Sequence, residues 1–189
     1  QYSPGYSATN LPESKMFFPR MWENRDDSYV EIYRSYIDGS RPTFIENLTF
    51  FFDYQLNWMY WRYFLWNFAG RQNDIHSPIP GDIFKGNWEC GIGFIDRIRL
   101  GDQSGAPACL ADNKSKNHYY MLPLILGLIG MFFQYSRDKR GCWLTFLMFF
   151  MTGIAIVLYL NQSPLQVRER DYAYAGSFYF FSVWIGLGV

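Results

Sequence analysis

The stretch Asn161-Gln-Ser-Pro-Leu-Gln-Val-Arg-Glu-Arg-Asp-Tyr-Ala-Tyr-Ala-Gly176 organises this chain. Its four consecutive charged residues, Arg168, Glu169, Arg170 and Asp171, lie between two strongly apolar segments. Ionisable side chains at the edge of a bilayer are costly unless they are paired or solvated, so they indicate a functional site. The alternative is a solvated loop whose charges only mark a membrane boundary. These residues alone leave both interpretations open.

The apolar segments around this stretch approach the length of membrane-spanning helices. Residues 119–135 and 142–160 contain no charged side chain, and as helices they would be about 25 and 28 Å long, against a hydrocarbon core of roughly 30 Å. A third apolar run, residues 174–189, reaches only about 24 Å. Since the chain also begins without Met, we expect sequence beyond both of its ends. The pattern predicts an α-class, multispanning helical membrane protein with two full transmembrane helices and a truncated third.

The overall composition agrees with a membrane protein and disfavours nucleic acid as a partner. Lys plus Arg and Asp plus Glu both number 17, so the formal net charge is zero, and the basic residues form no stripe. Aromatic residues make up 21% of the chain. Trp and Tyr at that density suit the interface between lipid and water, where an apolar ring and a polar edge are both accommodated.

Residues 43–69 predict an aromatic helix at that interface. Thr43 and Glu46 have the spacing of a capping box, and Gly70 is a stop signal. A helical period places Asp53 and Asn57 on one face, continued by Tyr60 and Phe64, with Arg62 nearly opposite. We expect this helix to lie in the interface or to pack against spanning helices, either as a purely packing element or as part of a site.

Residues 1–117 otherwise predict an outer loop region, and residues 118–189 the transmembrane region. Short helices are expected near residues 26–36 and within 87–100. Cys90 and Cys109 share one loop and can pair if that loop faces an oxidising compartment. Neither His76 nor His118 has a partner at metal-ligand spacing, and the sequence has no P-loop and no Gly-rich dinucleotide turn, so no metal site or cofactor is expected.

The short basic loop of residues 136–141 sets the predicted topology. Loops rich in Lys and Arg stay in the cytoplasm, which puts residues 1–117 and 161–173 together on the outer face. A site where these loops meet the membrane edge can hold a lipid-borne anion beside a polar acceptor, because Arg binds phosphate through paired donors. The alternative is that Glu169 and Asp171 merely neutralise Arg168 and Arg170.

Several longer motifs resemble the DUF2723 family, classed as glycosyltransferase family 117, whose members are large multispanning proteins common in Bacteroidota. The family is related to a vertebrate transmembrane protein O-mannosyltransferase. The segments that carry the resemblance are residues 15–21, 52–55, 59–64, 66–74, 86–88, 159–162 and 168–178.

The resemblance implies a GT-C architecture in a bacterial inner membrane, with a multi-pass chain and an active site that faces the periplasm. The donor would be a polyprenyl-phosphate sugar such as mannose, and the acceptor a protein Ser or Thr. The catalytic residue is unknown, because the family's acidic general base would precede Gln1. Such an enzyme acts with no cofactor, and this chain on its own would be inactive.

Within the chain, Arg168 and Arg170 are the leading candidates to bind the lipid phosphate, followed by Arg62 and Arg71. The remaining candidates orient these groups or stack on a sugar or lipid: Asp74, Glu169, Asp171, Trp61 and Trp66. Two other functions use the same features without this chemistry. One is a transporter or binding protein for a lipid-linked glycan, and the other is a membrane assembly subunit.

Overall fold

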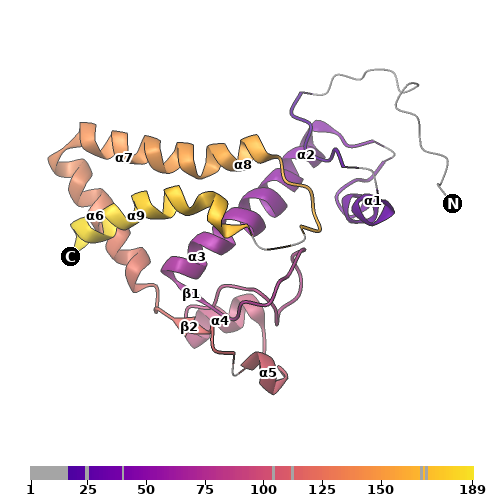
Figure 1. Ribbon diagram of the computed structural model, residues 1–189, viewed down its shortest axis with the longest axis horizontal. Coiled ribbons are helices and arrows are strands. Elements are labelled where there is room, and N and C mark those ends of the chain that lie inside the picture. Colours follow the sequence, from indigo (N-terminus) through magenta and orange to yellow (C-terminus); the bar gives the residue numbers. More distant parts are fainter. Residues whose placement is uncertain are drawn as a thin grey trace.

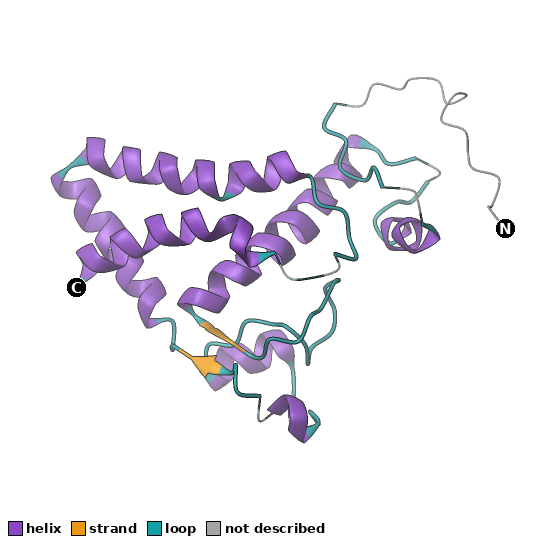
Figure 2. Cartoon of the chain, in the orientation of Figure 1, coloured by secondary structure: helices purple, strands orange, loops and turns teal. Residues whose placement is uncertain are grey.

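The computed structural model describes residues 17–23, 26–39, 41–103, 105–111, 113–166, 168 and 170–189. The described chain is mostly helical, which confirms the α class (Figures 1 and 2). The strands β1 (Gly70–Arg71) and β2 (Asn117–His118) form one short antiparallel pair, with Gly70 opposite His118. This pair closes the loop region between the aromatic helix and the apolar helices.

The predicted aromatic helix forms as one continuous rod, residues 44–68. It consists of α2 (Phe44–Phe50), the π-helical segment η1 (Phe51–Trp61) and α3 (Arg62–Phe68). The capping box between Thr43 and Glu46 is present, with both reciprocal hydrogen bonds made. Gly70 follows its end with φ 141°, a conformation that disfavours any other residue. Residues next to each end of this helix therefore determine where it begins and where it ends.

The π-helical segment changes which side chains share a face. A 3.6-residue period puts Tyr60 and Phe64 beside Asp53 and Asn57, but the structure buries the two aromatic residues and exposes the two polar ones. Arg62, predicted to lie on the opposite side, is also buried. The physical reason is that hydrogen bonds reaching five residues along the chain widen each turn and rotate the faces.

The apolar segments form α6 (Leu122–Arg137), α7 (Lys139–Thr152), α8 (Ile154–Leu160) and α9 (Ala175–Gly188), which pack against one another. α8 continues the line of α7 after Gly153, and α9 runs beside them in the opposite direction (Figure 1). Glycines let α6 approach α9 closely. A β carbon at Gly130 would collide with the backbone of Trp184, and one at Gly127 with the ring of Phe181.

The boundaries of these helices differ from the predicted ones. α6 begins at Leu122 because Tyr120 and Met121 adopt left-handed φ angles of 53° and 58°. The predicted loop of residues 136–141 shrinks to Asp138, whose side chain accepts a hydrogen bond from the backbone of Gly141 and so starts α7 early.

One helix among the described residues, Lys139–Leu160, is long and apolar enough to cross a membrane. It has 22 residues, of which an apolar stretch of 18 is only 17% buried. α6 is apolar but has only 16 residues, and the truncated third segment corresponds to α9, with 14. By length, the structure thus contains one spanning helix where two were expected.

The aromatic rod packs against the apolar helices instead of lying apart from them. Its buried aromatic side chains join those of the apolar helices in one core, and the Tyr60 hydroxyl lies 3.2 Å from the hydroxyl of Ser177. The ring of Phe64 lies 4.8 Å from that of Phe181. At the other end of the rod, α1 (Asp27–Arg34) contacts α2 through Tyr33 and Phe50, whose ring centroids are 5.4 Å apart.

The loop region between the strands contains α4 (Gly93–Leu100), which confirms the short helix expected within residues 87–100, and α5 (Ala108–Ala111), which was not predicted. Side-chain amides hold it together: Asn73 donates to the carbonyl of Phe84, and Gln72 to that of Ile83. Cys90 is buried, Cys109 is exposed, and both are free thiols, so the pair considered from the sequence is not formed.

Candidate functional site

Residues 161–166 follow α8 and lie against the aromatic rod, and the short 3-10 helix η2 (Asp171–Tyr174) leads into α9 (Figure 1). Asn161 turns the chain with φ 42°. Its carbonyl accepts a hydrogen bond from the Trp22 indole at 2.9 Å, and its side chain donates to the carbonyl of Pro19 at 3.1 Å. His76 Nε2 lies 2.7 Å from the carbonyl oxygen of Gln166. Distant parts of the chain therefore fix this segment in place.

A buried polar cluster lies where residues 161–162 meet the rod. Gln55, in the π-helical segment, donates from Nε2 to the carbonyl of Gln162 at 2.8 Å and to Oδ1 of Asn161 at 3.1 Å. Arg20 donates to the carbonyl of Leu158 at 2.9 Å, and its guanidinium carbon lies 3.8 Å from the centroid of the Phe18 ring. Burial lowers the pKa of Arg20 from its ordinary value.

Four buried polar atoms of this cluster have no hydrogen-bond partner among the described residues. They are Oε1 of Gln55, Nε of Arg20, and both Oε1 and Nε2 of Gln162. Each such atom costs about 1–3 kcal/mol when it stays unpaired. π-Helical segments are also frequent at functional sites. These four atoms can therefore form hydrogen bonds with a water molecule or with a polar group of a ligand.

A second cluster gathers predicted cationic residues around Trp66. The guanidinium carbon of Arg62 lies 4.9 Å from the centroid of a Trp66 ring, and that of Arg71 lies 5.4 Å away. Tyr63 packs edge-on against Trp66 at 5.2 Å, and its hydroxyl accepts a hydrogen bond of 3.3 Å from the backbone N–H of Arg170. The buried Nε1 of Trp66 has no acceptor among the described residues.

Arg62 is the most enclosed member of this second cluster, with 3% of its surface exposed. It donates from Nε to the carbonyl of Trp58 at 3.0 Å and from Nη1 to the carbonyl of Gly86 at 2.8 Å. Its guanidinium also stacks near the Trp58 ring at 4.4 Å. These contacts join the rod to the loop region.

Arg71 and Asp74 lie at the rim, next to the strand pair. Arg71 donates from Nε to the carbonyl of Ser115 at 3.3 Å. Asp74 is exposed and accepts a hydrogen bond of 3.1 Å from Asn113. That bond, more than the nearby charge of Arg71, lowers the pKa of Asp74 below its ordinary value. Asp74 is therefore ionised at neutral pH and complements Arg71.

The remaining predicted residues occupy different positions. Arg168 is exposed, whereas Arg170 and Asp171 are half-buried. Glu169 lies outside the described residues. Trp61 packs against Tyr60 and Phe64, each at 5.2 Å between ring centroids, and so belongs to the core packing of the rod. The structure thus brings Arg62, Trp66, Arg71, Asp74 and Arg170 into one neighbourhood and leaves Trp61 apart.

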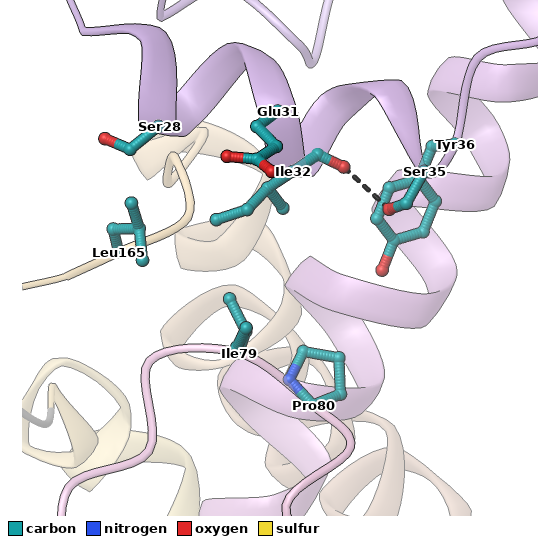
Figure 3. A pocket seen from close by; sticks show the side chains of 8 residues that line it. All are labelled: Ser28, Glu31, Ile32, Ser35, Tyr36, Ile79, Pro80 and Leu165. Carbon is teal, nitrogen blue, oxygen red and sulfur yellow. Dashed lines mark hydrogen bonds between the residues drawn. The ribbon is translucent and has the colours of Figure 1, made fainter.

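A pocket opens between α1 and the segment that carries these arginines (Figure 3). Its volume is about 550 Å³. Residues of α1 and just after it line one side, namely Ser28, Glu31, Ile32, Ser35 and Tyr36, while Ile79, Pro80 and Leu165 approach from the other side. The lining therefore mixes hydroxyls and a carboxylate with apolar side chains, which suits a ligand with both hydroxyl groups and apolar surface.

Sequence reasoning missed Arg20, Gln55 and Gln162. All three lie inside the segments on which the family resemblance rests, but two are uncharged and Arg20 stands far from the charged stretch in sequence. That Arg20, Gln55 and Gln162 lie close together is seen only in the tertiary structure. Among the described residues, no group of three or more His, Cys, Asp or Glu side chains is arranged to hold a metal ion.

Comparison with known proteins adds little that bears on this site. Residues 1–52 are similar to a family described as a family of unknown function (DUF8416). No curated protein and no solved structure matches the chain. Among the described residues, the chain is an α-helical protein with one helix long and apolar enough to cross a membrane. A polar cluster lies at residues 161–162, just after that helix, and a separate group of arginines surrounds Trp66 on the rod.

Proposed function

We propose that this chain is part of a membrane glycosyltransferase that moves a sugar, with mannose the first choice, from a lipid-phosphate carrier to a Ser or Thr hydroxyl of a protein. The observation that carries the proposal is the position of Arg170. Its backbone N–H donates to Tyr63, which packs on Trp66 beside Arg71, and only the short helix η2 separates it from the apolar helix α9. A lipid-borne phosphate at the membrane edge would meet cationic and aromatic groups there.

In this proposal the arginines bind and stabilise the departing phosphate. Arg168 and Arg170 contact it directly, and Arg71, which stacks near Trp66, adds a further cation with Asp74 as its orienting carboxylate. Cationic donors fixed in advance stabilise the charge that develops on the leaving group as the bond to the sugar breaks. The general base is a carboxylate that takes the proton of the acceptor hydroxyl. No described residue is assigned to that role.

The acceptor would enter through the pocket between α1 and Leu165. Its hydroxyl and carboxylate lining suits a Ser- or Thr-containing peptide, and Leu165 lies three residues before Arg168.

We also propose that α6, α7–α8 and α9 belong to a multi-pass bundle in a bacterial inner membrane. The basic turn at Arg137–Arg140 lies at one end of α7–α8 and residues 161–171 at the other (Figure 1). The positive-inside rule then directs the turn to the cytoplasm and the site to the periplasm. The large exposed area of Lys139–Leu160 supports contact with lipid, since a core helix of a water-soluble protein would be covered.

The test is transfer of labelled sugar from polyprenyl-phosphate mannose to protein in membranes that contain the natural protein. Arg170→Ala is expected to lower the transfer rate at least 100-fold at unchanged protein level, as loss of one stabilising donor in an enzyme site does. Arg97→Ala, at an exposed position of α4, is the matched control and should retain activity.

The outcomes separate the competing functions. An unchanged transfer rate in Arg170→Ala would show that the cluster of Arg170, Trp66 and Arg71 takes no part in the reaction. Binding of the lipid-linked sugar without transfer in the wild type would favour a transporter or binding protein. Absence of both binding and transfer would favour an assembly subunit.

A further inference from the structure

A groove between α6 and α7 lies at the opposite end of these helices from the candidate site. Its volume is about 260 Å³. The side chains that line it are apolar, aromatic or a thiol: Met131, Phe132, Tyr135, Cys142, Trp143 and Phe146. Phe132 is 72% and Trp143 64% exposed, so the groove is open on the outer side of the helix pair. Its lining suits a hydrocarbon chain.

Three cations surround the end of this groove at the turn between the helices. Arg137, Lys139 and Arg140 are all exposed. The guanidinium carbon of Arg137 lies 5.6 Å from the ring centroid of Phe133, and Nζ of Lys139 lies 5.6 Å from that of Tyr135, which itself lines the groove. The positive charge is therefore held next to the apolar lining.

Little negative charge offsets these cations. Asp138 stands between them in sequence and caps α7 by accepting the backbone N–H of Gly141 at 3.0 Å, so one carboxylate stands against three cations in this turn. Among the described residues, Lys85 pairs with Asp82 and Lys116 with Glu89, both away from this turn. The turn is thus open to an external anion.

We propose that this groove and turn bind an anionic phospholipid. One acyl chain lies between α6 and α7, and the phosphate of the headgroup contacts Arg137, Lys139 and Arg140. The charge complementarity selects an anionic headgroup, and the adjoining apolar groove selects a lipid over a free phosphate. Basic pockets between membrane helices bind such headgroups in the same way. This site depends on exposure of α6 and α7 to lipid and not on the proposed transfer reaction.

Brominated lipids test the proposal, because bromine on an acyl chain quenches a nearby Trp and Trp143 lines the groove. The natural protein in zwitterionic detergent is titrated with brominated phosphatidylglycerol and, separately, with brominated phosphatidylcholine. Quenching by phosphatidylglycerol should saturate at a lower lipid fraction, and Trp143→Phe should remove that high-affinity component. Equal quenching by the two lipids, or a component that persists in Trp143→Phe, would overturn the proposal.

Charge variants identify the headgroup contact. Combined Arg137→Gln, Lys139→Gln and Arg140→Gln should weaken phosphatidylglycerol binding about 100-fold, since each basic residue contributes roughly fivefold near an anionic lipid. Combined Arg34→Gln, Arg97→Gln and Lys114→Gln removes the same charge from exposed positions elsewhere and should leave binding unchanged. Equal weakening in the two triple variants would show nonspecific attraction. Displacement of the lipid by glycerol phosphate at equal concentration would show that the groove contributes nothing.

Discussion

Gly130→Ala is the sharpest test of how the apolar helices pack. A β carbon at this position would collide with the carbonyl group of Trp184 and lie 2.8 Å from the backbone N of Gly188. Because these atoms belong to the backbone of α9, no change of rotamer relieves the contact. The two helices must separate instead, which disturbs the buried Trp184 and its hydrogen bond of 2.7 Å to Gln134.

The expected magnitude follows from two opposing effects. Overpacking a tight contact costs about 1–3 kcal/mol, and a backbone contact belongs at the upper end of that range. Ala favours the helix over Gly by about 1 kcal/mol. The net loss in free energy of unfolding is therefore about 2 kcal/mol. For a chain of this size it corresponds to a drop of roughly 4–8 °C in the apparent melting temperature.

The assay is thermal unfolding in detergent, followed by the circular dichroism of the helices. Gly186→Ala is the matched control, since it lies in α9 and its β carbon would meet nothing within 4 Å. That variant should be as stable as the wild type or more stable by up to about 1 kcal/mol. Equal melting temperatures for the two variants would refute the close α6–α9 contact.

Three further predictions concern the site, the topology and the thiols. Gln162→Leu should raise the melting temperature, because it removes a buried amide without partners worth about 1–3 kcal/mol, and should lower activity; a lower melting temperature would contradict this. In a cysteine-free background, an impermeant maleimide should label Tyr172→Cys but not Ser136→Cys in intact cells, and the reverse pattern would invert the topology. In the folded wild type, Cys109 should react readily and Cys90 only after unfolding, because burial raises the pKa of the Cys90 thiol; mass spectrometry of the labelled peptides distinguishes them.

The sequence by itself determined the elements whose causes are local. The capping box at Thr43 and Glu46 starts the aromatic helix, Gly70 follows its end, and the long apolar runs become helices. These signals act over three or four residues, so they can be recognised without knowing the fold. The charged stretch after Leu160 was likewise visible, and part of it does lie beside Tyr63 and Trp66.

Only the tertiary structure decided which side chains meet. Arg62 was expected on the far side of the rod, but it is buried. The π-helical turns rotate it toward the interior, and its Nη1 donates a hydrogen bond to the carbonyl of Gly86 there. Gln55 and Gln162 stand 107 positions apart, yet Nε2 of one donates to the carbonyl of the other. Contacts between distant positions, and the rotation that a π-helix imposes on a face, follow from how the helices pack, and no local pattern of residues encodes them.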